Sequence, residues 1–413
     1  MTRIHPFKGV LPKPTNADRV VSQPYDQYSA ARIDEILREN KESFLNVIRP
    51  EDEGEHFLPN SPALFAKSKQ RFEDLVSENI LLVDNDPSIY VYSQHIGNNS
   101  FTGLIACASV EDYDNGTIKI HEQTIAHREQ ILRDYLEVCD INAEPVCFTY
   151  PRQGSLELLT EIIRQDPPYL NFKTDDGKRH ELWRISDEKW IAKFQEKFNL
   201  MEHIYIADGH HRSASSALLA HDHWAEGEKI TGDEPYNYFL GIFFPDDQLK
   251  IYEFNRVVTD LGNLGVGEFL EYLEKDFKVE KKDDIGIKPE YQGHFGMYLM
   301  GTWYRLTYKG RRSSESVKAL DVSILSDHIL TPLLGIEDLR TDPRIVFVPG
   351  YAGLNALENK VDSGSYDIAF SLYPVSGEEF YAISDQGKTM PPKSTYIVPK
   401  LLSGLTVYSL SRG

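Results

Sequence analysis

One stretch of the chain restricts its fold more than any other: HIYIADGHHRSASSALLAHDHW, residues 203–224. Ile204 and Ile206 alternate with an aromatic and a small residue, a pattern that favours a largely buried strand. Beyond the turn, four residues recur at i, i+3, i+4 and i+7, the spacing of one helical face. They are Ala214, Ala217, Leu218 and His221. The sequence therefore predicts a strand, a tight turn and a helix in direct succession.

The turn itself gathers residues capable of chemistry: Asp208, Gly209, His210, His211 and Arg212. A glycine allows backbone to approach a ligand closely, and the first N–H groups of a helix carry a partial positive charge that suits a phosphate. Arg212 and the histidines add further donors. The alternative is an ordinary corner in which Asp208 caps the helix and the histidines are solvated.

Composition narrows the class of protein. The 413 residues suffice for two or three domains, and 41% hydrophobic residues supply a core. A formal net charge of -20 argues against nucleic acid as a main partner, because such binding needs clustered cations. MTRIHPFKGV at the N-terminus lacks the apolar region of a signal peptide, and no segment has the apolar length of a membrane span. We therefore expect a cytoplasmic protein without a membrane partner.

The cysteines point to no disulfide framework or zinc site. They are Cys107, Cys139 and Cys147, an odd number without CxxC spacing. We expect buried thiols.

The pattern of elements predicts an α+β fold in three segments. Residues 1–90 form an N-terminal α/β unit with helices near residues 31–40 and 63–79. Residues 91–258 form a mixed-sheet core, and residues 259–413 a C-terminal α/β unit.

Two hairpins are expected in the core. The strands IYVYSQHI and FTGLIACASVEDY are joined by a turn at residues 97–100. A second strand pair brackets Pro245, Asp246 and Asp247 as a turn.

A second chemical candidate lies in IKIHEQTIAH, where His121 and Glu122 stand at a strand-to-helix junction. A single carboxylate suits a general base when a neighbour holds it ionised. An exposed Glu in the first helical turn, favoured by the helix dipole, has equal weight from these residues alone. A partner elsewhere in the chain must decide between the two interpretations.

His221 and Asp222 form a dipeptide that, together with His210 or His211, would suit a metal-dependent phosphohydrolase. A histidine near the end of a helix, paired with a carboxylate, is the commoner explanation.

Several motifs together resemble a bacterial family catalogued as a domain of unknown function. They are VVSQPYD, HEQT, LWRISD, YIADGHHR and PPKSTYIVPKLLSGL, and they span essentially the whole chain. The Gly209–Arg212 turn after a strand also resembles the ParB/sulfiredoxin-like fold. Archaeal free-serine kinases of that fold show a similar order of a His-Glu pair, an Asp-Gly-His-His-Arg turn and a late Pro-Lys-Thr-Thr stretch.

The resemblance implies roles for matching residues. Glu122 takes the place of the catalytic glutamate, supported by His121, and the turn from Asp208 to Arg212 takes the place of the phosphate-binding turn. Three late residues match the stretch that closes on the nucleotide: Lys393, Ser394 and Thr395. Gln123 departs from the Glu-Arg-Thr usual in the bacterial family, and this chain is longer than the kinases, which leaves the substrate open.

The predicted function is a nucleotide-dependent kinase acting on the hydroxyl of a small molecule such as free serine. Its fold would be a ParB/sulfiredoxin-like core with additional N- and C-terminal α/β segments, the last of them closing on the site. The expected ligands are ATP or ADP with Mg²⁺, for which Asp208 is the candidate protein ligand and a second catalytic residue. Two alternatives remain open, a ParB-like nucleotide-binding switch without turnover and the phosphohydrolase. The resemblance also leaves a homodimer open.

Overall fold

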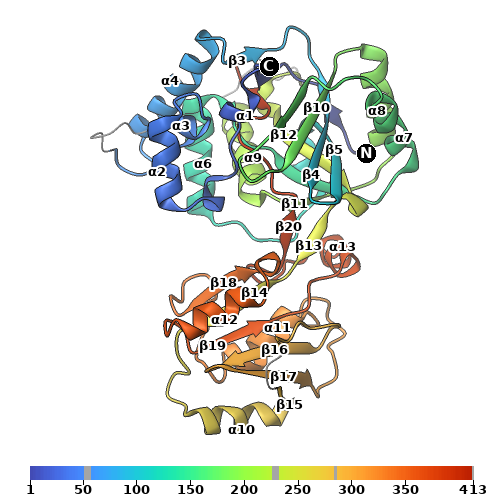
Figure 1. Cartoon of the computed structure of the whole chain (residues 1–413). Coiled ribbons are helices and arrows are strands. Elements are labelled where there is room, and N and C mark those ends of the chain that lie inside the picture. Colours follow the sequence, from blue (N-terminus) through green and yellow to red (C-terminus); the bar gives the residue numbers. More distant parts are fainter. Residues whose placement is uncertain (51–56, 226–231, 283–285, 412–413) are drawn as a thin grey trace. The chain divides into compact units, whose positions relative to one another are not determined.

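The computed structural model describes residues 1–50, 57–225, 232–282 and 286–411 and divides into two compact units. Unit 1 comprises Met1–Lys119, Gln123–Leu249 and Pro399–Gly413, and unit 2 comprises Ile120–Glu122 and Lys250–Val398. This division differs from the boundaries after residues 90 and 258 expected from the sequence. Figure 1 traces both units in the order of the chain.

A nine-stranded mixed sheet forms the centre of unit 1, in the order β6-β11-β8-β12-β5-β4-β10-β9 with β1 added to β5. Its strands are β1 (Ile4–His5), β4 (Ile89–Ile96), β5 (Asn99–Ser109), β6 (Ile118–Lys119), β8 (Val146–Tyr150), β9 (Leu170–Lys173), β10 (Arg179–Ile185), β11 (Ile204–Asp208) and β12 (Tyr238–Pro245). The β8–β12 and β6–β11 pairs are parallel and the other pairs are antiparallel. The prediction of a mixed α/β chain with a mixed sheet is therefore confirmed.

Helices surround this sheet and a second, four-stranded sheet in unit 1. They are α1 (Ala17–Val20), α2 (Ala30–Glu39), α3 (Leu45–Ile48), α4 (Pro62–Ser77), α5 (Val110–Asp114), α6 (Ala126–Cys139), α7 (Gly154–Ile163), α8 (Glu188–Asn199) and α9 (His210–Ala225). The four-stranded sheet has the order β3 (Leu81–Val83), β2 (Gly9–Pro12), β21 (Val407–Ser409) and β7 (Ile141–Asn142). Since β21 lies between β2 and β7, Val407–Ser409 is part of unit 1 although the preceding segment Lys250–Val398 forms unit 2.

The core of the large sheet depends on a glycine that accommodates an aromatic ring. Phe148 on β8 stacks on Phe243 of β12 with the ring centroids 4.8 Å apart. A Cβ atom at Gly241 would lie 2.6 Å from the Phe148 ring. Because real Cβ contacts are not so short, larger residues there would force β8 and β12 to shift.

The structure confirms one predicted hairpin and overturns the other. β4 and β5 pair antiparallel from Tyr90–Ile105 to Ile96–Asn99, as the sequence predicts. β5 begins earlier than expected, at Asn99, and residues 110–113, expected to continue the strand, belong to α5. The strand pair expected around Pro245 does not form, because β5 and β8 already occupy both edges of β12. The following strand, β13 (Lys250–Tyr252), pairs instead with β20 (Tyr396–Val398) in unit 2. All three cysteines are buried free thiols, as expected.

Unit 2 is built on a six-stranded antiparallel sheet in the order β15-β17-β16-β19-β14-β18. The strands are β14 (Phe254–Val258), β15 (Phe277–Lys282), β16 (His294–Leu299), β17 (Thr302–Tyr308), β18 (Ile345–Pro349) and β19 (Ile368–Ser371). Its helices are α10 (Val266–Asp276), α11 (Asp321–Leu325), α12 (Asn355–Asp362) and α13 (Gly377–Asp385), and a π-helical turn at Ser326–Leu330 follows α11. Buried Leu357 and Val361 of α12 pack against the sheet.

None of the helices in the described part of the chain combines the length and the apolar character that crossing a membrane requires.

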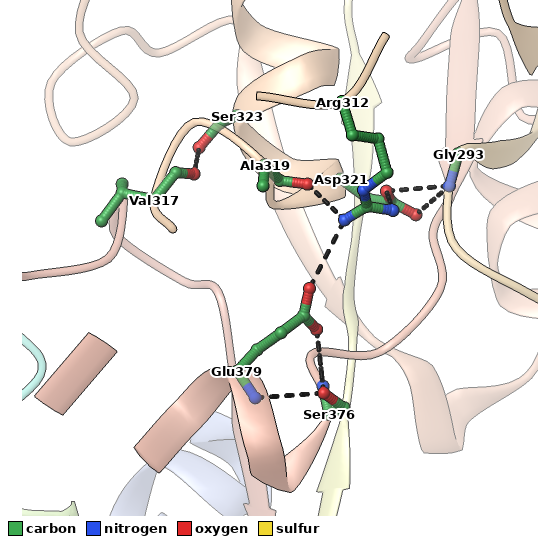
Figure 2. Close-up of polar contacts among 8 residues, drawn as sticks. All are labelled: Gly293, Arg312, Val317, Ala319, Asp321, Ser323, Ser376 and Glu379. Carbon is green, nitrogen blue, oxygen red and sulfur yellow. Dashed lines mark hydrogen bonds and ion pairs between the residues drawn. The ribbon is translucent and has the colours of Figure 1, made fainter. Parts of the chain in front are cut away.

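A buried carboxylate joins several loops of unit 2 (Figure 2). Both oxygens of Asp321 accept hydrogen bonds from the backbone N–H of Gly293, at 2.9 and 3.0 Å. Arg312 lies 3.3 Å from Asp321 and 3.4 Å from Glu379, which forms a capping box with Ser376 at the start of α13. Burial raises the pKa of Asp321 to about 6, although the Gly293 N–H and Arg312 favour its ionised form.

This raised pKa predicts a pH-dependent stability. The folded chain holds the Asp321 proton more tightly than the unfolded chain, so the contribution of this group to stability falls as pH rises from about 4 to about 6. Asp321→Asn should remove that fall. From about pH 4 to about pH 7 the free energy of unfolding should shift in favour of the variant, relative to the parent, by about 3 kcal/mol. Urea unfolding at a series of pH values measures it, and parallel curves for the two proteins would contradict the assignment.

Candidate functional site

The turn between β11 and α9 requires a glycine. β11 ends at Asp208 and α9 begins at His210, so Gly209 alone separates strand from helix. Gly209 has a φ of 103°, a backbone conformation that L side chains rarely adopt. A Cβ atom there would also lie 3.2 Å from the guanidinium of Arg212. The sequence prediction of strand, tight turn and helix is confirmed. The guanidinium of Arg212 lies against the backbone of the turn at Gly209.

Helix α9 buries a face of small residues. Its buried residues are His210, Ser213, Ser215, Ser216, Ala217, Leu219 and Ala220. The Ser213 hydroxyl donates to the carbonyl of His210 at 3.0 Å, and that of Ser216 donates to the carbonyl of Arg212 at 2.9 Å. Because these hydroxyls are satisfied within the helix, serine can be buried there as a small residue. Ala214 and Leu218, expected on the buried face, are only half-buried.

Asp208 forms an ion pair with a lysine that the sequence analysis did not select. Nζ of Lys400 donates to Oδ2 of Asp208 at 2.8 Å. Burial opposes ionisation of Asp208, but Lys400 and Arg212 outweigh that effect and hold its pKa well below the usual range. Asp208 is therefore a carboxylate throughout the neutral range, with a cation at hydrogen-bond distance.

A signal for Lys400 was present in the sequence. The late stretch contains two Pro-Lys pairs, at residues 392–393 and 399–400. The resemblance to the kinases selects the first pair, whereas the structure of unit 1 brings the second pair to the turn.

Arg212 is anchored on the loop that precedes β8. Its Nη1 donates to the carbonyl of Pro145 and lies 3.9 Å from the carboxylate of Glu144. His210 is buried and His211 is half-buried. The interpretation of both histidines as solvated is therefore wrong for His210.

His221 and Asp222 do not share a site with the histidines of the turn. His221 pairs with Asp114 at 2.8 Å, and Asp222 accepts a hydrogen bond from Arg133 at 2.7 Å. His221 lies eleven positions after His210 in one continuous helix, a separation of about 16 Å at the helical rise. The metal cluster on which the phosphohydrolase interpretation depends is not formed along α9.

His121 and Glu122 belong to unit 2, and a backbone hydrogen bond holds the chain at His121. The carbonyl of His121 accepts the Met390 N–H at 2.8 Å, and its ring lies 4.6 Å from that of Phe380. His121 is buried and Glu122 is exposed. Since α6 begins only at Ala126, Glu122 is not in the first helical turn, and that interpretation of its carboxylate is wrong.

The late stretch forms a turn in unit 2. Lys393 is exposed and has a φ of 57°, and its Nζ lies 5.2 Å from the centroid of the Phe254 ring. Ser394 is buried, and its hydroxyl donates to the carbonyl of Pro391 at 2.6 Å. Thr395 is half-buried, directly before β20. The hydroxyl of Ser394 thus closes the turn that presents Lys393.

A buried arginine supports this turn. Arg256 is 0% exposed, and its guanidinium donates to the carbonyls of Phe254 and Lys393, the latter at 3.1 Å. Burial lowers the pKa of Arg256 to about 9. In the sequence it lies in the strand pattern NRVV, which gave no reason to connect it with Lys393, 137 residues later.

The predicted residues thus fall into two groups. In unit 1 the structure brings Asp208, Gly209 and Arg212 together with Lys400. In unit 2 it joins the backbone at His121 to Met390, just before the turn of Lys393.

A family model described as "Protein of unknown function (DUF1015)" matches residues 4–323 of the chain. A search of curated proteins finds no match.

Solved structures show distant likenesses. A free serine kinase in complex with AMP is 14% identical with a TM-score of 0.36, over 75% of this chain and 92% of that chain. SbnI with a C-terminal truncation, from Staphylococcus aureus, is 13% identical with a TM-score of 0.38, over 74% and 88%. A conserved hypothetical protein from Pyrococcus furiosus is 14% identical with a TM-score of 0.34, over 75% and 96%. Likenesses this distant carry no conclusion about this chain.

The geometry of the turn predicts the effect of a single methyl group. Gly209→Ala should lower the free energy of unfolding by about 1–3 kcal/mol, because it forces alanine into a strained conformation and against Arg212. Gly154→Ala, at the start of α7 where the nearest atom is 4.0 Å away, is the matched control and should not destabilise the protein. Urea unfolding followed by circular dichroism compares the two variants. Equal stabilities would show that the turn tolerates a side chain.

Proposed function

From the premise that the chain belongs to the DUF1015 family, we propose that it is a nucleotide-dependent kinase that phosphorylates the hydroxyl of a small molecule, such as free serine. The nucleotide is ATP or ADP, and the core of unit 1 is of the ParB/sulfiredoxin-like type. The observation that carries the proposal is the grouping of two cations at the N-terminal end of α9, with Lys400 at 2.8 Å from Asp208 and the guanidinium of Arg212 against Gly209.

The phosphate-binding part of the proposal is the turn of unit 1. Gly209 offers backbone without a Cβ atom, and α9 contributes the positive end of its dipole. Arg212 has donors beyond the one directed at Pro145, and Lys400 is a compact cation held at 2.8 Å from Asp208. These groups suit the concentrated negative charge of a nucleotide's phosphates, with His210 and His211 completing the turn.

Asp208 is the candidate ligand for Mg²⁺. Its side chain is 42% exposed and its pKa is depressed, so it offers the ionised oxygen donor that Mg²⁺ prefers. When bound, Mg²⁺ would neutralise charge on the phosphate oxygens. The chain's own contribution is to hold Asp208 ionised through Lys400 and Arg212.

Glu122 is the proposed general base. A base must reach a substrate hydroxyl, and Glu122 is exposed while the buried His121 beside it anchors the backbone through Met390. Lys393 is exposed on a turn held by Arg256, and we assign it, with Thr395, to the part of unit 2 that contacts the nucleotide.

The chemistry balances without a covalent enzyme intermediate. The carboxylate of Glu122 accepts the proton of the substrate hydroxyl as its oxygen bonds to the terminal phosphorus. The bond from that phosphorus to the bridging oxygen breaks, and the remainder of the nucleotide leaves with the bond electrons. Positioning and charge neutralisation supply most of the rate in such transfers.

The role of Lys400 in phosphate binding can be tested by removing its charge. Lys400→Met keeps the length of the side chain but loses a charge-assisted donor, so the affinity for ATP with Mg²⁺ should fall about tenfold or more. Lys189→Met, which removes an exposed lysine on α8, is the matched control and should bind as the parent does. Isothermal titration calorimetry measures both. An unchanged affinity in the Lys400 variant would remove this lysine from the phosphate site.

A substitution at Glu122 distinguishes a role in catalysis from a role in nucleotide binding. Glu122→Gln keeps the size of the side chain but cannot accept a proton, so turnover with ATP and serine, or another hydroxyl compound phosphorylated by the parent, should fall by about 100-fold or more. Nucleotide affinity should hardly change, because the phosphates are assigned to other residues. Glu268→Gln, at an exposed position of α10, is the control.

Two outcomes would contradict this assignment. Parental turnover in Glu122→Gln would show that the carboxylate is not the base. A parent protein that binds nucleotide and phosphorylates no hydroxyl compound would instead be a nucleotide-binding switch.

A further inference from the structure

A cavity of about 330 Å³ lies in unit 1, between the start of α9, α4 and α6. Its wall is largely apolar, and α4 and α6 supply Leu64, Phe65, Ile131, Leu132 and Leu136. A volume at the lower end of the range for ligand pockets, with apolar walls and few polar groups, is typical of a site for a small organic molecule.

Two charged side chains of opposite sign line this cavity. Arg212 and Glu144 both line it, and Nη1 of Arg212 lies 3.9 Å from Oε2 of Glu144. Each side chain is 29% exposed, so both remain accessible.

Both charged groups are held in place by the protein. Arg212 donates to the carbonyl of Pro145, and Oε1 of Glu144 accepts the Ser403 hydroxyl at 2.6 Å. Asn142, which also lines the cavity, is oriented by the Leu240 N–H at 3.3 Å. A ligand would therefore meet a preorganised pair of charges and would not have to order them.

The pair of charges selects the kind of ligand. A ligand with a single carboxylate would be attracted by Arg212 and repelled by Glu144, and a ligand with a single ammonium group would meet the reverse. A zwitterion satisfies both, since its carboxylate accepts from the guanidinium while its ammonium donates to Glu144. An apolar side chain on the same molecule would be buried against the walls contributed by α4 and α6.

We propose that this cavity binds a free α-amino acid with an apolar side chain, through Arg212 and Glu144 for its charged groups and the apolar residues of α4 and α6 for its side chain. The ligand is distinct from the nucleotide and the hydroxyl substrate of the proposed kinase, although the site shares Arg212 with the phosphate-binding turn, and its binding without nucleotide does not depend on that function. A ligand held by Arg212 also connects this cavity to the turn at Gly209, because the same guanidinium lies against both.

The test is isothermal titration calorimetry of the full chain, without nucleotide, using L-leucine and L-phenylalanine. At least one of them should bind saturably. Two analogues of phenylalanine that each lack one charge, 3-phenylpropionate and phenethylamine, should bind about tenfold more weakly or worse than the amino acid that binds. No binding of either amino acid to the parent, or equal binding of the singly charged analogues, would overturn the proposal.

Two variants locate the binding in the cavity. Leu132→Trp should fill it, and Glu144→Gln should remove the partner of the ammonium group with little change of shape, and each should weaken binding about tenfold or more. Leu158→Trp, at an exposed position of α7 that is 58% accessible, is the matched control and should bind normally. Circular dichroism establishes that each variant is folded. Parental affinity in folded Leu132→Trp or in folded Glu144→Gln would overturn the assignment.

Discussion

The ion pair between Lys400 and Asp208 joins two points of unit 1 that are 192 residues apart in the sequence. Lys400 stands where the chain has returned from unit 2, and Asp208 is the last residue of β11. Both side chains are partly exposed, so the pair contributes little to stability by itself. Its consequence is positional, because it sets a fixed cation beside the turn at Gly209 and keeps the carboxylate ionised.

The turn at Gly209 joins a charged group, the guanidinium of Arg212, to a helix with a buried face of small residues, α9. Arg212 is pressed against Gly209 and directed to Pro145, so its guanidinium faces the loop before β8. The buried serines of α9 satisfy their hydroxyls within the helix, which lets it pack as a helix of small residues. The missing Cβ atom at Gly209 therefore leaves room for the Arg212 guanidinium, and the small buried serines are accommodated in the packed face of α9.

Local patterns predicted local structure well. The alternation of residues 89–109 predicted the β4–β5 hairpin, because a strand pair joined by a two-residue turn depends mostly on neighbouring residues. The same reasoning failed around Pro245, where the local pattern was equally suggestive. There the outcome depended on β5 and β8, which occupy both edges of β12. Likewise, helical spacing predicted that Ala214 and Leu218 lie on the buried face of the helix. In the structure the buried face of α9 contains the serines instead, and these two residues are half-buried.

The sequence by itself determined the β4–β5 hairpin, the succession of strand, turn and helix around Asp208 to Arg212, and the buried thiols, since each of these depends on residues close together in the chain or on hydrophobicity. Only the tertiary structure decided which residues far apart in the sequence come into contact. It brought Lys400 to Asp208, Arg256 to the carbonyl of Lys393, and Glu144 to the side of Arg212. Such pairings follow from strand order and chain return, which no local pattern of residues encodes.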